Sequence, residues 1–516
     1  MINFIKKIKD FTDEIINRTT MYRLVIYCLS ILIIIAAIFG YLGIMPYSPV
    51  YLLFSAIFIT AVCWLINLIF ANVFEAPSNF ESAIITALIL TIIITPPQGW
   101  NDAQYFALAG WAAILAMASK YVLAIGKKHI INPAALAVVI TSFTLNLSAS
   151  WWIGTAAMTP FVFVLGALIT RKIKRWDLVL AFFFAAFITI LTPKIIAGEN
   201  IVVGAEKIML LSPILFFAFI MLTEPMTTPP TKNLQIIYGA LVGFLFAPWV
   251  NLGGIYFTPE LALISGNFFS YLVSSKTKLI LSFQQKIKIA NNEYDFIFNS
   301  PQNLKFKPGQ YMEWTLAHPR PDNRGIRRFF TIASSPTENK IRLGIKFYDP
   351  PSSFKKKLAA FERGDEIVAT QLAGDFTLPN NPDKKIIFMA GGIGITPFRS
   401  MLKYLIDTNE KRPIIVFYSN KTPGDIAYGG ILEEAEEKLG IKTIYSLTGE
   451  ETAPMPRYNI RGRLTPQIIS KEVPDYKERI FYISGPPSMV NQFSGILKKM
   501  GIPKRKIKID FFPGFA

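Results

Sequence analysis

The sequence predicts a multidomain protein: a ten-helix transmembrane bundle, then an antiparallel β-barrel domain, then an α/β domain with a parallel sheet. Of the 516 residues, 52% are hydrophobic and only 17% are charged, which is too apolar for an ordinary cytosolic protein. The apolar excess ends near Val273, and beyond Lys276 short apolar runs alternate with turn residues, as in a soluble protein. We therefore expect domains at 1–275, 276–379 and 380–516.

The apolar half contains ten stretches that approach the roughly 20 residues needed to cross a hydrocarbon core. The first has no small-residue cleavage site and no polar mature start, so we expect a membrane span rather than a signal peptide. The ten stretches lie at 21–43, 50–70, 80–95, 103–125, 130–147, 154–170, 176–197, 207–223, 235–250 and 259–273.

Ten spans place both termini on one side of the membrane, and the basic residues indicate which side. Lys and Arg prefer short cytoplasmic loops, whereas the loops at 96–102, 148–153 and 251–258 contain neither. Only the 194–206 loop departs from this pattern, with Lys194 near its start. We expect an integral protein of the cytoplasmic (inner) membrane, in contact with lipid, with both termini and the whole soluble half in the cytoplasm. The basic residues on that side are Lys6, Lys7, Lys9, Arg18, Arg23, Lys127, Lys128, Arg171, Lys172, Lys174, Arg175, Lys232, Lys276 and Lys278.

Composition excludes several classes of partner and cofactor. The formal net charge of +18 is also found in proteins that bind nucleic acid, but here the basic residues follow the expected cytoplasmic loops, so we expect no nucleic-acid partner. Cys28 and Cys63 both lie in apolar segments, so neither a disulfide framework nor a thiolate metal site is expected. His129 and His318 lie outside the apolar spans, which excludes a bis-histidine haem inside the bundle.

Three loops expected on the cytoplasmic side carry polar, Pro-containing stretches next to a span. They lie at 75–79, 131–134 and 223–230 and contain Glu75, Asn132 and Glu224. Irregular backbone at a membrane edge is tolerated where protein or a cavity satisfies its polar groups, and acids at such places are candidates for function. The alternative is that these residues are surface caps and turns.

Parts of the apolar half resemble a known family. Asn132-Pro133-Ala134, Leu222 to Thr227 (LTEPMT) and Tyr238 to Gly243 (YGALVG) resemble the membrane subunits of the sodium-pumping NADH:quinone oxidoreductase (its B subunit) and of the Rnf complex (its D subunit). The resemblance covers most of 20–273 and implies the same ten-helix count and an electron-carrying flavin. In the family, FMN is esterified to a Thr in a Ser-Gly-Ala-Thr type motif. The nearest string here, Gly154 to Thr159 (GTAAMT), does not match that motif. We therefore expect a second flavin, FMN or riboflavin, to be held without a covalent bond.

The soluble half begins with alternating stretches at 280–289, 293–299 and 341–347, typical of antiparallel strands. Arg328-Phe329-Phe330-Thr331 resembles the Arg-x-aromatic-Ser/Thr signature of the ferredoxin–NAD(P)H reductase superfamily. The resemblance implies bound FAD, with Arg328 on its pyrophosphate, Phe330 stacked on the flavin and Thr331 at the flavin N5 edge. Phe330 replaces the usual Tyr, which removes one phenolic hydrogen bond.

Further matches to that superfamily follow along the chain. Ser352 and Ser353 open an expected helix whose N-terminus suits a phosphate, and Gly374 lies in the string that ends the superfamily's FAD domain. The C-terminal Phe515 resembles the aromatic residue that covers the flavin. We therefore expect Thr331, Phe330 and Phe515 to be the residues at the reacting centre.

An apolar strand at 385–390 runs directly into a glycine turn and a helix start. This order builds a cradle for a dinucleotide pyrophosphate, because glycine lets backbone amides approach the phosphates. The strings Phe417 to Asn420 (FYSN) and Tyr482 to Val490 (YISGPPSMV) resemble the superfamily's nicotinamide-side strands. The coenzyme-binding residues expected here are Gly391, Gly392, Gly394, Thr396, Pro397, Gly485, Pro486 and Met489.

Together these features predict a membrane flavoenzyme that oxidises NADH or NADPH through FAD and passes electrons to a flavin, a quinone or an external acceptor, with further electron-transfer subunits as candidate partners. One alternative is a redox-driven or redox-regulated ion or solute transporter. Another is a ferric-reductase type of machine without haem, which the absence of histidines from the apolar spans disfavours. The residues near 419–421 contain neither an evident acidic determinant nor an Arg clamp for the ribose, so the choice between NADH and NADPH stays open.

Overall fold

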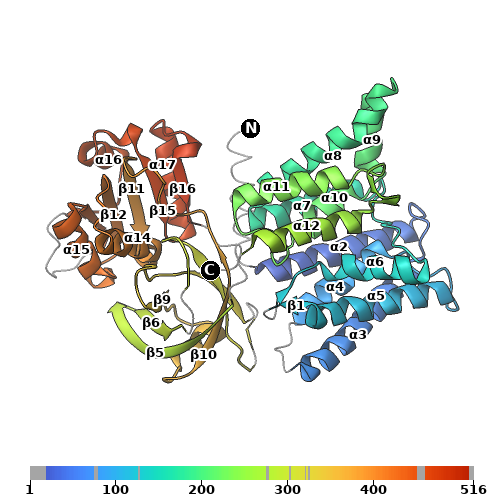
Figure 1. Ribbon diagram of the computed structural model, residues 1–516, viewed down its shortest axis with the longest axis horizontal. Coiled ribbons are helices and arrows are strands. Elements are labelled where there is room, and N and C mark those ends of the chain that lie inside the picture. The colour runs from blue at the N-terminus through green and yellow to red at the C-terminus, as the bar shows by residue number, and fades with distance from the viewer. Residues whose placement is uncertain are drawn as a thin grey trace. The chain divides into compact units, whose positions relative to one another are not determined.

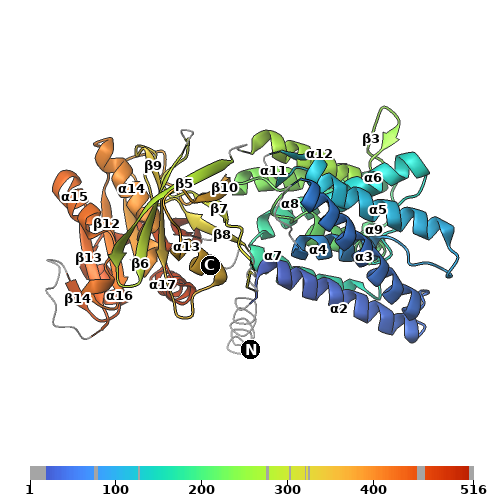
Figure 2. The same ribbon diagram turned by 90° about the horizontal axis from the view of Figure 1, so that it is seen from below.

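The computed structural model describes residues 19–74, 80–125, 128–274, 278–300, 304–319, 321–322, 326–449 and 459–510. The chain divides between Lys276 and Thr277 into two compact units. We call them the N-terminal unit and the C-terminal unit and describe each by itself (Figures 1 and 2).

The N-terminal unit is a bundle of helices with two short hairpins. Each of the ten apolar stretches contains helix, and the eighth contains the end of α9, then α10 and the π-helical segment η1. The elements are α2 (Met21–Tyr41), α3 (Pro49–Val73), α4 (Phe80–Ile93), α5 (Ala103–Val122), β1 (Ala124–Ile125), β2 (Lys128–His129), α6 (Pro133–Leu145), α7 (Thr159–Ile173), α8 (Trp176–Ile196), α9 (Ile201–Leu210), α10 (Ile214–Phe216), η1 (Phe217–Met221), α11 (Lys232–Leu245), β3 (Asn251–Leu252), β4 (Ile255–Tyr256) and α12 (Pro259–Val273).

The prediction of ten membrane spans is not supported. Within the described residues, four helices are long and apolar enough to cross a membrane (α2, α3, α5 and α8), or five segments if α9 and α10–η1, bent by 65°, form one span. Helices α4, α6, α7, α11 and α12 have only 13 to 15 residues, which is about 20 Å of helix against a hydrocarbon core of about 30 Å. The apolar stretches extend beyond these helices: α6 ends at left-handed Asn146, before the end of the stretch at 130–147, and α7 begins only at Thr159 in the stretch at 154–170.

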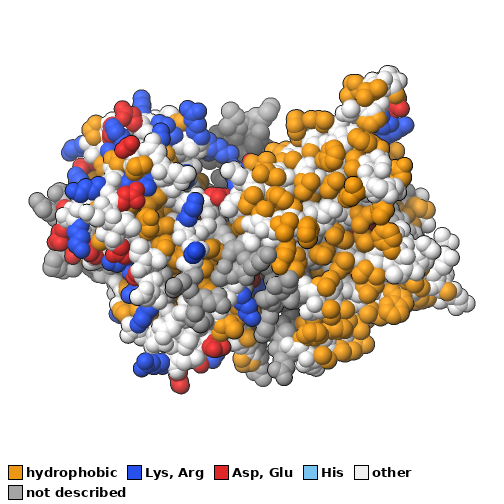
Figure 3. All heavy atoms as spheres, in the orientation of Figure 1, with side chains coloured by type: hydrophobic (Ala, Val, Ile, Leu, Met, Phe, Trp, Pro, Cys, Tyr) orange, Lys and Arg blue, Asp and Glu red, His pale blue; other side chains and the backbone are white. Residues whose placement is uncertain are grey.

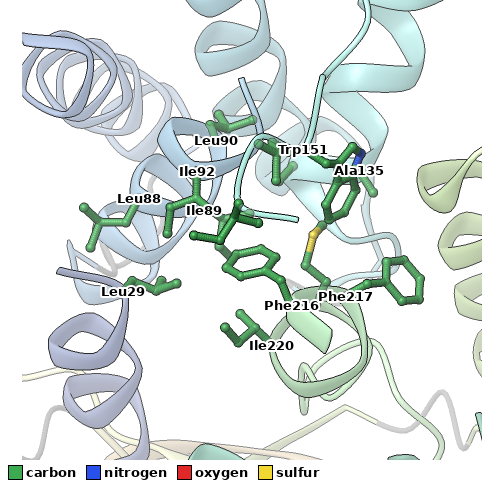
Figure 4. Close-up of a cluster of buried hydrophobic side chains, with 14 of the residues drawn as sticks. Leu29, Leu88, Ile89, Leu90, Ile92, Ala135, Trp151, Phe216, Phe217 and Ile220 are labelled. Carbon is green, nitrogen blue, oxygen red and sulfur yellow. The ribbon is translucent and has the colours of Figure 1, made fainter. Parts of the chain in front are cut away.

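Two of the short helical segments form the centre of the N-terminal unit. Every residue from Thr86 to Ile93 in α4, and every residue from Ile214 to Met221 in α10–η1, is buried. Figure 4 shows Leu90 and Ile92 in the same hydrophobic cluster as Phe216 and Ile220. A helix that is apolar on all sides must be covered by protein or lipid, and here other helices cover both segments.

Helices α6 and α12 run antiparallel. The backbone N–H of Asn132, the N-cap of α6, donates to Asn267 Oδ1 in the second half of α12 at 2.8 Å. At the other end of the pair, the start of α12 and the second half of α6, from Val138 to Phe143, line the same cavity. Both helices have a polar N-cap followed by proline, so each presents a polar helix start at an opposite end of the pair.

The first sheet of the C-terminal unit is six-stranded and antiparallel, in the order β8-β7-β10-β5-β6-β9. Its ladder is not closed among the described residues, so the predicted barrel is not confirmed. One backbone hydrogen bond, from Ala333 N to Arg342 O at 2.9 Å, links the chain after β8 to β9. The elements are β5 (Leu279–Ala290), β6 (Glu293–Asn299), β7 (Tyr311–Thr315), β8 (Arg327–Thr331), β9 (Lys340–Lys346), α13 (Ser353–Ala359) and β10 (Glu366–Ala373).

The second sheet is six-stranded and parallel, as the sequence predicts, in the order β14-β13-β12-β11-β15-β16. The strand order reverses at β11, and ligands of such sheets bind outside the carboxyl ends of the strands at this kind of reversal. The elements are β11 (Ile386–Gly391), η2 (Gly392–Ile395), α14 (Thr396–Asp407), β12 (Ile414–Asn420), η3 (Pro423–Asp425), α15 (Gly429–Leu439), β13 (Lys442–Leu447), β14 (Asn459–Arg461), α16 (Pro466–Glu472), η4 (Tyr476–Glu478), β15 (Ile480–Ser484), α17 (Pro487–Lys499), η5 (Lys504–Lys506) and β16 (Ile507–Ile509).

The surface of the N-terminal unit is mainly apolar, whereas that of the C-terminal unit carries many charged side chains. Figure 3 shows hydrophobic side chains covering the visible face of the N-terminal unit, whereas Lys, Arg, Asp and Glu are spread over the C-terminal unit. Exposed side chains on the N-terminal helices include Ile34, Ile57 and Phe184. An apolar outer face of this extent suits a lipid environment.

Glycines let helices α8 and α11 pack backbone to backbone. A Cβ built on Gly239 would lie 2.4 Å from the carbonyl oxygen of Leu178, and one on Gly243 would lie 2.4 Å from that of Phe182. Neither carbonyl can move without distorting α8. The glycines in the Tyr238 to Gly243 string are therefore required by helix packing.

We expect Gly239→Ala to destabilise the protein and Gly110→Ala, in α5, to leave it unchanged or stabilise it. The added methyl group at position 239 meets backbone, at a cost of about 1–3 kcal/mol. At position 110 nothing lies within 4 Å, so only the better helix propensity of Ala remains, about 1 kcal/mol. Thermal unfolding in detergent measures both. Equal shifts of the two midpoints would contradict this account of the α8–α11 contact.

Candidate functional site

Strand β8 and helix α13 bring together the residues predicted to bind the FAD pyrophosphate. The guanidinium carbon of Arg328, a 5% exposed residue, lies 5.2 Å from the centre of the Phe354 ring in α13. The carboxylate of Asp322 lies 3.6 Å from Arg328 Nη2 and accepts from the backbone N–H of Ser353 at 2.9 Å. Arg328 and the start of α13 thus both contact the Asp322 carboxylate. A phosphate, like a carboxylate, is an anion that accepts hydrogen bonds, so the same two groups suit a phosphate.

The two serine hydroxyls at the start of α13 already have protein partners. Ser352 Oγ accepts from Lys355 N at 3.2 Å, and Ser353 Oγ accepts from Asp322 N at 2.8 Å and lies 2.9 Å from His318 Nε2. Ser352 is therefore the helix N-cap. If both residues bind cofactor, as predicted, they do so either through groups other than these hydroxyls or by exchanging the present partners of the hydroxyls for the cofactor.

Thr331 carries the clearest sign of an absent partner. Its residue is 4% exposed, and its hydroxyl oxygen has no hydrogen-bond partner in the described part of the chain. Buried polar atoms are rarely left unpaired, because the loss costs about 1–3 kcal/mol. A flavin edge with hydrogen-bonding atoms is a suitable partner for this hydroxyl. Phe330, on the same strand, lies with its ring 6.0 Å from Phe354.

Gly374 adopts φ +113°, a conformation that L side chains rarely adopt. Gln310 Nε2 donates to its carbonyl at 3.3 Å, and a Cβ there would lie 3.0 Å from the Tyr311 ring. The predicted FAD-domain end thus packs against the 306–311 turn.

The glycine turn after β11 forms at the reversal of the parallel sheet, where coenzyme binding is expected. Gly392 has φ +50°. A Cβ on Gly391 would lie 2.2 Å from Met489 Sδ and 3.4 Å from Pro486, and one on Gly394 would lie 2.5 Å from both Gly485 Cα and Ser484 O. The predicted coenzyme residues of 391–397 and 485–489 therefore pack against each other.

The turn ends at α14, where Thr396 Oγ1 donates to Ile393 O at 3.2 Å and Pro397 lies in the first turn of the helix. Proline is common there because the first helical N–H groups have no partner within the helix. The free N–H groups at such a helix start suit a phosphate.

Glu293 and Lys346 lie behind Gly392 and were not found from the sequence. Lys346 Nζ donates to Glu293 Oε1 at 2.8 Å, and the two atoms lie 3.9 Å and 3.7 Å from a Cβ built on Gly392. Burial raises the pKa of Glu293, although Lys346 opposes this. The pairing of β6 with β9 places them opposite each other, a long-range register that motif reading does not supply.

In the N-terminal unit, Asn132 and Glu224 meet as part of one polar network. Asn132 Nδ2 donates to Glu224 Oε2 at 3.0 Å, and Thr227 Oγ1 donates to the same oxygen at 3.0 Å. Asn267 Nδ2 donates to the Tyr238 hydroxyl at 3.0 Å. The loops containing Asn132 and Glu224 therefore form one site, which Asn267 and Tyr238 extend. Glu75 and Phe515 lie outside the described residues.

A second polar site, around Glu260 at the start of α12, was also missed. Glu260 is 4% exposed, accepts from Trp151 Nε1 at 2.6 Å and lines a cavity of about 340 Å³ together with Ser142 and Tyr256. A buried acid in an apolar segment is the sequence signal that would have found it.

Comparison with known proteins concerns the C-terminal unit. Residues 388–494 match the family described as "Oxidoreductase NAD-binding domain". The chain is 29% identical over 216 residues to the reductase component of propane 2-monooxygenase from Rhodococcus jostii, covering 41% of this chain and 57% of that protein. It is 27% identical over 223 residues to the glycine betaine monooxygenase reductase subunit of Chromohalobacter salexigens, covering 42% and 60%. The chain thus spans less than two thirds of the length of these relatives.

Among solved structures, Amycolatopsis cytochrome P450 reductase GcoB superposes with a TM-score of 0.41 at 21% identity, covering 46% of this chain and 70% of that one. The cytochrome b5 reductase domain of Ulva prolifera nitrate reductase superposes with a TM-score of 0.40 at 23% identity, covering 46% and 98%. The C-terminal half thus contains a match to an oxidoreductase NAD-binding domain and is similar in sequence to the reductase components of monooxygenases.

We expect Thr331→Val to spare folding and to weaken flavin function. The hydroxyl has no hydrogen-bond partner among the residues that the structure describes, so its replacement by a methyl group of similar shape costs the FAD-free protein little or even stabilises it. A lost hydrogen bond to flavin would lower FAD affinity about 10-fold. Fluorescence titration of FAD-stripped protein measures the affinity, and thermal unfolding measures the stability. Loss of stability without FAD, at unchanged FAD affinity, would refute this role.

Gly394→Ala is expected to raise KM for the coenzyme at least 10-fold, by about 1.4 kcal/mol or more, and to leave bound FAD in place. Even one methyl group there meets the backbone of Ser484 and Gly485, so the turn must shift. Gly495→Ala in α17, where nothing lies within 4 Å, is the matched control. The check is steady-state kinetics with an artificial acceptor, and an unchanged KM would contradict the prediction.

Proposed function

We propose that this chain is a membrane-bound enzyme that oxidises NADH or NADPH through FAD and delivers the electrons to an acceptor reached through its helical unit. The observation that carries the proposal is the combination, in one compact unit, of the Thr331 hydroxyl on β8, unpaired within the described segments, and the glycine turn at the reversal of the parallel sheet. Bound FAD supplies the conversion of a two-electron donor into single-electron transfer.

The residues of the C-terminal unit perform distinct tasks in this proposal. Arg328 and the start of α13 hold the FAD pyrophosphate, with Asp322 giving way to it, because the phosphate would otherwise meet a carboxylate. Phe330 provides an apolar face for the flavin and Thr331 a hydrogen bond at its edge. Gly391, Gly392 and Gly394 keep the turn free of side chains, and Thr396 begins the helix that faces the coenzyme phosphates. Gly374 closes the FAD side, and the resemblance to the reductase superfamily assigns Phe515 to the flavin.

A second flavin, FMN or riboflavin, bound without a covalent link is the further part of the proposal for the N-terminal unit. The network of Asn132, Glu224, Thr227, Asn267 and Tyr238 supports it, since it supplies several hydrogen-bonding groups inside an apolar bundle. The resemblance to the flavin-carrying subunits of the sodium-pumping oxidoreductase and Rnf complexes supports it as well. Glu75 belongs to the same expected site. A quinone or an external compound is the alternative acceptor.

The orientation with the reductase half and both termini in the cytoplasm is likewise proposed, because NAD(P)H is found there and the basic loops favour it. Partner subunits for electron transfer also remain part of the proposal. The second candidate function is a redox-driven or redox-regulated transporter of an ion or solute. Glu224 and Glu260 favour it, since acids inside apolar bundles mark substrate or ion pathways. A haem-free ferric-reductase type of machine is the third.

The test uses the full chain purified in detergent. Its absorbance spectrum is expected to show oxidised flavin without a haem Soret band, and anaerobic NADH or NADPH should bleach it. Denaturing gels should show no flavin fluorescence on the polypeptide, and acid extraction should release FAD and a second flavin. Protein without flavin, or a Soret band, would overturn the proposal. A fluorescent band that survives denaturation would overturn the noncovalent part alone.

Asn132→Ala is expected to lower the extracted flavin by about one equivalent per chain while FAD and the rate of bleaching by NAD(P)H stay unchanged. The variant removes the amide that donates to Glu224. Asn251→Ala, at an exposed hairpin, is the control. Unchanged flavin stoichiometry in Asn132→Ala would refute the second flavin site. Uptake of Na⁺ by proteoliposomes given NADH would then favour the transporter.

A further inference from the structure

A set of charged and hydroxyl side chains joins the two sheets of the C-terminal unit. We call Asp295, Glu338, Arg342, Arg399 and Tyr428 the intersheet network. Arg399, in α14, contacts Glu338 through Nη1 and Nη2, the latter at 2.9 Å, and donates from Nη1 to Ala333 O at 3.0 Å. The next residue adds a parallel bond, from Ser400 Oγ to Ser334 O at 2.6 Å.

The network continues from Glu338 into the strands of the first sheet. Glu338 also accepts from Arg342 Nε at 3.1 Å, and Arg342 Nη1 donates to Asp295 Oδ2 at 2.8 Å. Asp295 Oδ1 accepts from the Tyr428 hydroxyl at 3.2 Å, and the Tyr428 ring lies 5.7 Å from the guanidinium carbon of Arg399. The contacts therefore form a closed circuit through α14, β9, β6 and the chain before α15.

Arg399 and Asp295 are buried, Glu338, Arg342 and Tyr428 are partly buried, and the charges of the circuit balance. Arg399 is 4% exposed and Asp295 1%, and two arginines face two carboxylates. Burial opposes ionisation of Glu338, but Arg399 outweighs it and holds the pKa of that carboxyl below its usual value. A buried pair of this kind contributes little net stability compared with apolar packing, so its value lies in fixing one geometry.

The two anchor points lie next to the residues assigned to the two cofactors. Ala333 and Ser334 follow Thr331 by two and three positions, and Arg399 and Ser400 follow Thr396 by three and four. We propose that Arg399 and Ser400 are positioning residues that fix the separation between the flavin at β8 and the coenzyme whose phosphates bind at the 391–396 turn, and hence the distance from the flavin to the nicotinamide. This inference rests on the proposed function.

The separation matters because the reaction transfers a hydride. The C4–H bond of the nicotinamide breaks and an N5–H bond of the flavin forms, so that NAD(P)H loses two electrons and becomes NAD(P)⁺ while the flavin is reduced. The reacting atoms must be about 3–3.5 Å apart, and a displacement of about 1 Å lowers rates by up to about 100-fold. Arg399 and Ser400 contact neither reacting atom and act through the backbone that carries the sites.

The test compares Arg399→Lys and Ser400→Ala with Arg412→Lys in full-length holoenzyme. Arg412 is a matched control, since it likewise joins a carboxylate, Glu410, and a carbonyl, Pro379 O at 2.7 Å, away from the network. Three quantities are measured: FAD content, the dissociation constant for the coenzyme, and the rate of anaerobic flavin reduction by NAD(P)H and by its 4-deuterated form. The long-wavelength absorbance of nicotinamide stacked on flavin, which does not depend on turnover, is a fourth.

Arg399→Lys is expected to keep FAD and to bind coenzyme within about threefold of the unmodified protein. It should reduce flavin about 10-fold more slowly, with a larger deuterium effect and a weaker stacking absorbance. Ser400→Ala should show the same changes to a smaller degree, and Arg412→Lys none. If Arg399→Lys and Ser400→Ala lower the unfolding temperature but leave flavin reduction and the stacking absorbance unchanged, the inference is overturned. The two residues would then only stabilise the fold. If NAD(P)H fails to reduce the flavin of the unmodified protein, the proposed function itself fails.

Discussion

The close crossing of two backbones at Gly394 and Gly485 constrains the whole C-terminal unit. A Cβ on Gly394 would lie 2.5 Å from Gly485 Cα, so the turn after β11 can rest on the turn after β15 only without a side chain. Because β11 and β15 are neighbouring parallel strands, this crossing fixes where α14 begins. The start of α14 in turn places Arg399 and Ser400 against Ala333 and Ser334. A local steric requirement thus determines how the parallel sheet is joined to the antiparallel one.

Such local requirements explain which features could be predicted from the sequence. The glycine turn at 391–394 and the strand carrying Arg328 to Thr331 follow from short strings, because the backbone shape that each needs is set by a few adjacent residues. The Arg399–Glu338 contact and the Glu293–Lys346 pair could not be predicted, since they join residues 61 and 53 positions apart. Nor could the engaged hydroxyl of Ser353, whose partners His318 and Asp322 belong to another segment.

The number of spans was wrong for a different reason. A hydropathy window counts apolar residues whether or not they belong to one helix. Left-handed Asn146 ends α6 inside the apolar stretch at 130–147, and α7 begins only at Thr159 in the stretch at 154–170. The short central segments α4 and α10–η1 are apolar because other helices surround them, not because lipid does. Inside such a bundle the backbone beyond a short helix needs polar partners. Asn132, Glu224 and Asn267 supply such groups at one end of the α6–α12 pair, and Trp151 and Glu260 at the other.

The unpaired atoms of the C-terminal unit link stability to cofactor binding. Thr331 Oγ1 and Glu293 Oε2 are buried without a hydrogen-bond partner among the described residues, at a cost of about 1–3 kcal/mol each. They lie at the two places where the flavin and the coenzyme are proposed to bind, on β8 and behind the 391–394 turn. Any ligand that pairs such an atom binds only the folded state, so it raises the free energy of unfolding by mass action. On the proposed function, the fold of the reductase half is therefore incomplete without its cofactors, and the intersheet network holds the two sites in place before they are filled.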